Sequence, residues 1–539
     1  MMWTQVLLPV SNMKDFHSIE RRDILFSALI FFSGLMLYIR TLAPGLLLGD
    51  SAEFQTLAYT LGMTHPTGYP VYIILAHWFT LLPIGEMAWR VNLFSAFWGA
   101  LTLAFLYLIL RIIIGRRIAA FSGPLILSVM PLFWIHSIVA ELYAPASALI
   151  SLIILTILMW RTTDHTCYLY AAALLGGLGL GVHGFIVFML PGVLVYLVLK
   201  LKSRRAWLGS VVWAIFGVAF TLIAFYILDR TDTNAGYYHV TVRHALSAWN
   251  LTGADFDTPL ERLKFLWFPR QFSANMFSSG QLFLAKNWQA YKDLLTKDLS
   301  WAGISLALLG VLGLARYKWK EFLLLVIIWG GQTIFVLNYK VRDFIVFFTP
   351  GFVFLTLFAG VGCGLVIHFV EWAIKPYSGA RKFISFLPSF TGLLLFGVLM
   401  GGYFSTITDS WHTRRPIFLQ NSANDLYPYL VDQPEMPHAR ATGLVNALED
   451  NAIVFSDWND VYSYYYVAYL EKNRPGMDFF EAYPQADELA SSTADYISSN
   501  LGTRPIYFTV KPIGRQAKKF EFIPVSKDGQ QLFEVIREK

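Results

Sequence analysis

Residues 69–82 (YPVYIILAHWFTLL) decide how many times this chain crosses a membrane. The run is apolar but only 14 residues long, and prolines bound it at positions 70 and 83, whereas a transmembrane helix needs about 20 apolar residues. Counting it as a span would reverse the side of every later loop and would scatter the basic clusters over both sides of the membrane. We therefore predict a short interfacial or re-entrant helix here.

Eleven longer apolar runs surround this segment, and their flanks fix an orientation. If the N-terminus lies inside, then Lys14, Arg21, Arg22 and the later basic clusters all fall on the inner side of the membrane, as the positive-inside rule requires. The sequence therefore predicts a polytopic α-helical membrane protein with about eleven transmembrane helices and a cytoplasmic N-terminus, in the inner or plasma membrane of a bacterium. The predicted spans are 24–42, 93–113, 118–137, 143–160, 168–182, 184–199, 207–228, 301–315, 321–338, 345–369 and 384–404.

The composition agrees with this class of protein. Of the 539 residues, 56% are hydrophobic and 14% charged, against about 25% charged in soluble domains, so a purely soluble enzyme is excluded. The net charge of +6 does not indicate nucleic acid as a partner, because the basic residues flank apolar runs.

An odd number of spans places three segments outside. These are a first outer loop at 43–92, a large loop at 229–300 and the tail 405–539, so we divide the chain into a membrane domain (1–404) and a soluble domain (405–539). The tail alternates strand-like runs at 452–456, 505–510, 521–525 and 531–536 with an aromatic-rich helical pattern at 460–472. We expect a small C-terminal α/β domain on the outer face.

The first outer loop carries the most informative ionisable residues. Asp50 opens a helical pattern and Glu53 follows three residues later, so the two carboxylates share a helix face. An N-cap and a dipole partner would explain them in a soluble helix, but beside hydrocarbon such groups are costly unless they are used. His65 follows in the turn HPTGYP.

Other ionisable groups fall on the same predicted side. They are Glu141, Tyr143, His183, Lys340, Arg342 and Asp343. Solvated helix ends would account for each of them alone, but together they offer carboxylates for a base or a cation and basic groups for an anion. Attack of an acceptor hydroxyl on a lipid-phosphate-linked sugar needs this combination next to lipid.

The stretch GDSAEFQTLAYTLGMTHPTGYPVY resembles a family of multi-span GT-C glycosyltransferases whose animal representative is a protein O-mannosyltransferase. The resemblance continues in LLPIGEMAWRVNLFSAFWGALT, FWIHSIVAELYAP, LGLGVHG, NYKVRDFIVFFTP and AIVFSDWNDVYSYYYVAYL. More distantly, the first loop is similar to that of aminoarabinose transferases and fungal-type protein O-mannosyltransferases, in which the histidine-proline segment is a juxtamembrane helix.

The resemblance implies roles for individual residues. Asp50 matches the acidic catalytic residue of the first loop, and Glu53 is expected to be a helper or a metal contact. His183 stands where aminoarabinose transferases carry a lysine on the lipid phosphate. Two positions depart from the family pattern. Thr67 replaces a proline, and Lys340 and Arg342 occupy a loop that often reads N-Y-D-I-P-D, which favours anion binding there over a metal.

The sequence thus predicts inverting transfer of one sugar, such as mannose, from a polyprenyl-phosphate donor to a hydroxyl of a protein, glycan or lipid. Asp50 would be the base, with Glu53 beside it. His183, Lys340 and Arg342 would hold the donor phosphate, and His65, Glu141, Tyr143 and Asp343 would line the site. A transporter or flippase of lipid-linked sugars and a membrane-anchored binding module are the alternatives. No ligand set has a spacing diagnostic of a metal, so a divalent cation stays open.

Overall fold

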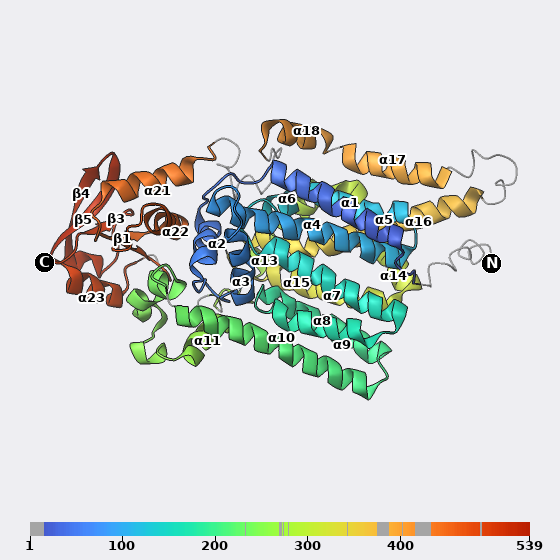
Figure 1. Cartoon of the computed structure of the whole chain (residues 1–539), viewed down its shortest axis with the longest axis horizontal. Helices are drawn as coiled ribbons and strands as arrows, with labels where there is room; N and C mark the ends of the chain where they lie inside the picture. Colours follow the sequence, from blue (N-terminus) through green and yellow to red (C-terminus); the bar gives the residue numbers. More distant parts are fainter. Residues whose placement is uncertain are drawn as a thin grey trace.

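The computed structural model describes residues 16–231, 233–268, 272, 274–278, 280–341, 343–374, 387–401, 403–415, 433–485 and 488–539. Figure 1 shows an elongated molecule, with a bundle of roughly parallel helices at the N-terminal end and a mixed helix and strand region at the C-terminal end. Short helices from the first outer loop lie between these two parts.

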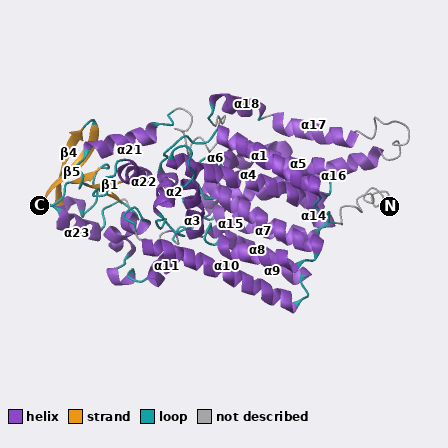
Figure 2. Cartoon of the chain, in the orientation of Figure 1, coloured by secondary structure: helices purple, strands orange, loops and turns teal. Residues whose placement is uncertain are grey.

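The bundle makes the chain a multi-pass membrane protein. Seven helices are long and apolar enough to cross a membrane: α1 (Arg21–Arg40), α4 (Met87–Ile114), α7 (Tyr143–Thr163), α10 (Arg204–Thr231), α14 (Ser300–Tyr317), α15 (Trp319–Leu337) and α16 (Thr349–Ile374), the last with the turn η6 (Phe344–Phe348) before it. Shorter apolar helices run beside them: α5 (Arg117–Val129), α8 (Thr166–Gly179), α9 (Met189–Lys200) and α17 (Leu387–Gly401). Figure 2 shows how helix dominates this part of the chain.

Each of the eleven predicted runs contains helix among its described residues; residues 384–386 and 402 of the last run lie outside the described part of the chain. The run 118–137 is two helices, α5 and α6 (Pro131–His136), because Pro131 cannot donate the backbone hydrogen bond that would continue α5. Met130 before it is extended, as a residue preceding proline prefers to be. The decisive run 69–82 contains the 11-residue helix α3 (Pro70–Thr80), which at 1.5 Å per residue is too short to span.

Glycine allows the tightest helix contact of the bundle. A Cβ on Gly310 of α14 would meet the backbone of Phe358 in α16, and a Cβ on Gly362 of α16 would meet the backbone of Leu306 in α14. Small residues permit such close approach between helices in a membrane, where packing and not water exclusion holds them together. Substitution of either glycine would force the two helices apart.

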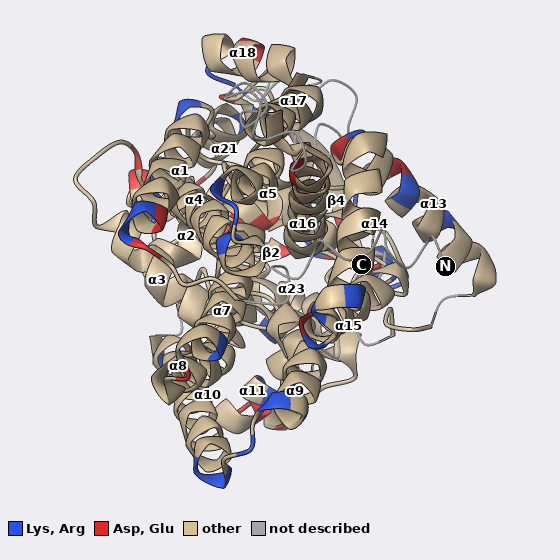
Figure 3. Ribbon diagram, turned by 90° about the vertical axis from the view of Figure 1, so that its right-hand side faces the viewer, with Lys and Arg blue, Asp and Glu red and all other residues tan. Residues whose placement is uncertain are grey.

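Basic residues mark one end of the bundle. Arg111, Arg161, Lys200 and Arg316 lie in the last turns of α4, α7, α9 and α14, and Arg204 begins α10. Figure 3 views the molecule from this end, at which helix α1 begins, and shows Lys and Arg on the helix ends and connections that face the viewer.

The C-terminal region forms a mixed five-stranded sheet in the order β2-β1-β3-β5-β4. Its strands are β1 (Ile453–Ser456), β2 (Asp478–Glu481), β3 (Ile506–Phe508), β4 (Phe520–Lys527) and β5 (Gln530–Glu538). β1 pairs parallel with β2 and β3, and β5 pairs antiparallel with β3 and β4. Strand β2 was not predicted, because DFFE is short and its apolar pattern is brief.

Helices flank the sheet and link it to the membrane part. They are α18 (Phe404–Thr413), α21 (Met436–Ala447), α22 (Trp458–Tyr465) with its π-helical extension η9 (Tyr466–Glu471), and α23 (Ser491–Asn500). The predicted helix 460–472 thus begins earlier, at Trp458, since Asp457 caps it by accepting a hydrogen bond from the Asp460 amide at 3.2 Å. α18 lies alongside the bundle (Figure 1).

The tail and the first outer loop share one hydrophobic core. This core contains Phe54 of α2 (Gly49–Thr60), Tyr72 of α3, and Tyr462 and Tyr465 of α22. It also takes in Tyr238 of η3 (Tyr238–Val242) and residues of η4 (Arg243–Trp249) and α11 (Pro259–Trp267) in the large outer loop. The last helix of that loop, α13 (Gln281–Asp298), packs in the core of the bundle instead. A chain that ends at residue 405 would lose more than a third of the buried residues of the shared core, so point substitutions test the tail more cleanly than truncation does.

Candidate active site

Helix α2 carries the two first-loop carboxylates at the end of the bundle nearest the tail. Gly49, at φ +58°, takes a left-handed conformation that residues with a side chain rarely adopt, and it turns the chain into the helix. Asp50 follows in the first turn, where the helix dipole favours a negative charge, and Glu53 lies one turn later, fully buried.

A buried amide pair holds this loop on the bundle. The Gln55 Oε1 accepts from the Leu47 amide at 2.9 Å, and the Gln55 Nε2 donates to the Asn92 Oδ1 of α4 at 2.9 Å. That same Asn92 oxygen accepts from the Ala140 amide at 3.0 Å, which ties in the turn before α7. Because these groups are buried and hydrogen-bonded, the loop has a defined position.

Asp50, His65 and Glu53 form a connected cluster. The two Glu53 oxygens hold His65, with Oε1 accepting from its backbone N–H at 2.8 Å and Oε2 lying 2.5 Å from its Nδ1. The His65 Nε2 then faces the Asp50 Oδ2 at 3.9 Å. The Asp50 side chain is 40% exposed, so Asp50 is the member of the cluster that an incoming group can reach. The buried Glu53 holds His65 in place.

The carboxylates change the charge state of His65. Burial lowers the pKa of its imidazole, but Glu53 and Asp50 outweigh burial and raise the pKa to about 9. At neutral pH the Glu53–His65 pair therefore keeps a proton, and His65 presents an N–H toward Asp50.

This charge state gives a stability prediction. Because the folded pKa of His65 lies above its ordinary value of 6.5, its stabilising effect is complete below about pH 6.5 and is lost as the pH rises toward 9. We expect the melting temperature of the detergent-solubilised protein to fall between pH 6.5 and 9.5, and to fall less in His65→Gln. His438→Gln, which removes an exposed histidine paired with Glu471, is the control and should keep the wild-type slope. Equal slopes in all three proteins would refute the charge assignment.

His183 lies at the turn between α8 and η2 (Gly184–Phe188). Its Nδ1 accepts a hydrogen bond from the Phe185 amide at 3.0 Å, which leaves the ring hydrogen on Nε2. Burial lowers the pKa of this imidazole to about 3, so the ring is neutral and can donate but carries no charge. The turn is held against α3 because the Gly181 carbonyl accepts from the Val71 amide at 2.9 Å.

A chain of rings links His183 to the carboxylates. The Tyr69 ring lies 5.2 Å from the His65 ring and stacks on His183 at 6.0 Å between centroids. Tyr143, at the start of α7, lies 5.6 Å from His183 and 5.7 Å from Phe347 of η6. Four of the predicted site residues, Asp50, Glu53, His65 and Glu141, interact through charge with one another, and the rings join His183 and Tyr143 to them.

Glu141 lies in the turn before α7, 6% exposed. Its Oε1 is 3.5 Å from the Ser51 hydroxyl, at the limit of a hydrogen bond, and its backbone N–H donates to the Ser95 hydroxyl at 3.3 Å. It raises the pKa of His65 as a third carboxylate after Glu53 and Asp50. Glu141 thus adds negative charge beneath the cluster and does not face its open side.

The loop before α16 contributes less than the sequence predicts. Lys340 is exposed, and its backbone amide donates to the Asn275 carbonyl at 2.9 Å. Asp343 is exposed at the start of η6, and its charge acts on Tyr143. Arg342 lies outside the described residues. The phosphate-binding role of this loop therefore stays a prediction.

The tail supplies site residues that the sequence analysis did not assign. The Trp458 Nε1 donates to the Asp50 Oδ1 at 2.6 Å, although 408 positions separate the two. Burial, and then the charges of Glu53, Asp457 and Asp50, raise the pKa of Glu481 to about 7. Ser456 and Glu481 are register partners that end β1 and β2, so the carboxyl edge of the parallel strands faces α2. The sequence predicts a strand followed by a helix at 452–472. A loop that leaves the carboxyl end of a parallel strand is a position where functional groups collect, so this pattern was the signal that could have identified these residues.

The described residues contain no group of three or more His, Cys, Asp or Glu side chains arranged to hold a metal ion. The cluster at α2 is instead a carboxylate with one open side, backed by a protonated histidine-carboxylate pair. This arrangement suits proton removal from an incoming hydroxyl.

Comparison with solved structures defines the fold. The structure matches that of ArnT from Cupriavidus metallidurans bound to undecaprenyl phosphate over 95% of this chain and 98% of the ArnT chain, with a TM-score of 0.56 at 12% identity. The chain therefore has an ArnT-like multi-helix membrane fold.

Sequence comparison finds relatives for part of the chain. Residues 50–207 match the model "Protein O-mannosyl-transferase TMEM260 N-terminal domain". The chain is 34% identical over 119 residues to Protein O-mannosyl-transferase TMEM260 of Mus musculus, which is 22% of this chain and 17% of the mouse protein. It is 20% identical over 344 residues to the tmem260 protein of Dictyostelium discoideum, or 57% of this chain and 39% of that protein. The matches span less than half the length of both relatives. They agree with the resemblance read from the sequence: part of this chain, above all residues 50–207, is similar to TMEM260-type protein O-mannosyltransferases.

Proposed function

We propose that this chain transfers one sugar, a hexose such as mannose, from a polyprenyl-phosphate donor to a hydroxyl of an acceptor protein. The observation that carries the proposal is the open Asp50 carboxylate, fixed by Trp458 and backed by the Glu53–His65 pair, in a TMEM260-type segment. The fold match to a transferase crystallised with undecaprenyl phosphate supports a lipid-phosphate donor.

The chemistry is a single displacement with inversion at the sugar. The acceptor oxygen attacks the anomeric carbon while Asp50 takes the hydroxyl proton, and the bond from that carbon to the phosphate oxygen breaks. Polyprenyl phosphate leaves with the electron pair. Neutral His183 would donate its Nε2 hydrogen to a phosphate oxygen, and Lys340 and Arg342 would add positive charge; Glu141, Tyr143 and Asp343 would line the site.

The topology follows from the same proposal. Seven long and four shorter apolar helices make eleven spans, with α3 lying at the outer surface. The basic end of the bundle then faces the cytoplasm, and the tail and both large loops lie outside. We retain the division at residue 404 as a working boundary, with the tail docked on the membrane domain.

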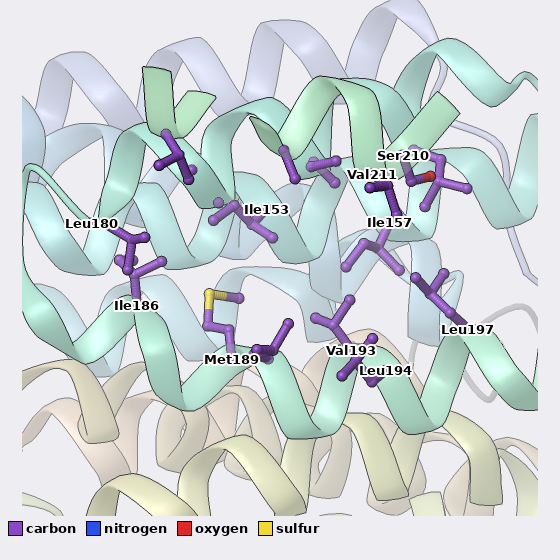
Figure 4. A pocket seen from close by; sticks show the side chains of 18 of the residues that line it. Ile153, Ile157, Leu180, Ile186, Met189, Val193, Leu194, Leu197, Ser210 and Val211 are labelled. Atoms are coloured by element: carbon purple, nitrogen blue, oxygen red, sulfur yellow. The ribbon is translucent and has the colours of Figure 1, made fainter. Parts of the chain in front are cut away.

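An apolar cavity is the proposed groove for the polyprenyl chain (Figure 4). It encloses about 330 Å³ between α7, α8, α9 and α10. Leu180 and Ile186, which line it, flank His183 by three residues on either side, and the cavity continues along α9 to Leu197. A lipid tail lying there would bring its phosphate to the His183 turn.

Gly176 tests the groove. It lines the cavity, and a Cβ built on it meets no described heavy atom within 4 Å, so Gly176→Leu fills the space without moving the backbone. We expect the KM for a purified polyprenyl-phosphate mannose to rise about 10-fold, since the bulk displaces lipid at a cost of roughly 1.4 kcal/mol. Gly330→Leu on α15 is the control, because its Cβ also meets open space but lies outside the cavity lining. An unchanged KM in Gly176→Leu would place the lipid elsewhere.

A further inference from the structure

The tail reaches the base of the proposed reaction through one side chain. Trp458 is the first residue of α22, and the Asp457 cap and strand β1 set its position. Its indole Nε1 donates to the Asp50 Oδ1 at 2.6 Å, while the Asp50 Oδ2 faces His65 at 3.9 Å. The two oxygens of the carboxylate therefore have different neighbours, one on each side.

Three rings hold the indole in this place. Its centroid lies 5.7 Å from His65, 6.1 Å from Tyr237 and 5.4 Å from Tyr462, with interplanar angles of 88°, 76° and 79°. Such edge-to-face contacts fix the plane of a ring, and with it the direction of its N–H. The indole thus has little freedom to turn away from Asp50.

A docking role alone does not require this hydrogen bond. Other contacts hold α22 and η9 in place. The Thr56 hydroxyl of α2 donates to the Tyr462 carbonyl of α22 at 3.2 Å, and the Tyr466 hydroxyl of η9 accepts from the Ala88 amide at the start of α4 at 3.1 Å. The shared core buries Tyr462 and Tyr465 as well. The indole N–H is directed at the one carboxylate of the cluster that is open to solvent.

We propose that Trp458 is a positioning residue for transfer: its N–H holds the Asp50 carboxylate in one orientation, so that the Oδ2 is presented to the acceptor hydroxyl. The inference rests on the proposed function, since it assigns Asp50 as the base. It also gives the tail a part in the reaction, because the site is incomplete without residue 458. A hydrogen bond to a charged group contributes enough to fix a rotamer and to favour the ionised form.

The test compares three variants in detergent with polyprenyl-phosphate mannose and an acceptor peptide. Trp458→Phe keeps an aromatic ring and loses the N–H. Trp249→Phe is the matched control, because Trp249 packs in the same core as the partly buried Trp458, but its Nε1 has no hydrogen-bond partner among the described residues. Thr56→Val removes a different hydrogen bond between α2 and α22 and leaves the indole in place.

We expect kcat to fall about 10-fold in Trp458→Phe, with an unchanged KM for the donor, and to stay near wild type in the other two. The titratable groups that interact with Asp50, which are His65, Glu53 and Tyr69 of the first loop, Tyr143 of α7 and Glu481 of the tail, stay in place in this variant.

Two results would overturn the inference. One is a wild-type kcat in Trp458→Phe; the other is an equal loss in Thr56→Val, which would mean that Trp458 acts only by docking the tail. If the Phe variant does not purify as a monodisperse protein, β-(3-benzothienyl)alanine at position 458 replaces N–H by sulfur at nearly the same shape and faces the same two criteria. Failure of the proposed function is a separate result, since the wild-type protein would then transfer no sugar.

Discussion

Asp50→Asn is expected to lose sugar transfer, by about 10²- to 10⁴-fold, because an amide cannot take the proton of the acceptor hydroxyl. The asparagine oxygen can still accept the Trp458 N–H, and the side chain is 40% exposed, so the fold should survive. The measurement is the rate of mannose transfer from a purified polyprenyl-phosphate donor to an acceptor peptide, followed by mass spectrometry.

Glu86→Gln is the matched control for this substitution. Glu86 is an exposed carboxylate in the same outer loop, at the start of α4, so its replacement changes the net charge equally. Donor binding, measured by the thermal shift on adding the lipid donor, should persist in Asp50→Asn. Near-wild-type transfer by Asp50→Asn would remove Asp50 as the base, and with it the proposed mechanism.

Glu53→Gln is expected to reduce transfer about 10- to 100-fold. Glu53 is fully buried and both its oxygens hold His65, so the amide leaves the His65 Nδ1 facing a neutral partner and removes the largest of the charges that raise the His65 pKa. The pKa of His65 then falls, and the charged form that faces Asp50 is less favoured. Breaking a buried charge pair by changing one partner costs about 3–5 kcal/mol, so the melting temperature should fall as well.

A double-mutant cycle separates this effect from general destabilisation. If Glu53 acts through His65, then Glu53→Gln/His65→Gln should transfer sugar no more slowly than Glu53→Gln alone, because neighbouring residues in one network are not additive. Losses that multiply would mean that Glu53 contacts the reaction independently of His65.

Much of the membrane part was predictable because its signals are local. Apolar runs and their basic flanks depend on a few tens of consecutive residues, and each of the eleven runs contains helix among the residues that the structure describes. Residues 69–82 were also predictable from local signals. Their bounding prolines and their short length indicated a helix, α3, that is too short to span the membrane. Pro131 shows the limit of a prediction from apolar runs. The run 118–137 is continuous in the sequence, but the helix is interrupted between α5 and α6 in the structure.

The site was predictable only in part. Asp50, Glu53 and His65 lie within 16 positions, so the sequence motif identified them as site residues. The motif did not indicate which carboxylate is exposed to solvent and which is buried. The neutral state of His183 depends on its burial among rings from α3 and α7. Trp458 and Glu481 were missed because a strand edge that faces another part of the chain has no local pattern.

The sequence by itself determined that this chain is a multi-pass membrane protein with a carboxylate-rich first outer loop. The length of an apolar run and the charges beside it determine whether that run crosses the bilayer and in which direction. Both can be read from consecutive residues of the sequence. Only the tertiary structure decided the arrangement of the site, because the hydrogen bond from Trp458 to Asp50 depends on a shared core that docks a distant tail on α2.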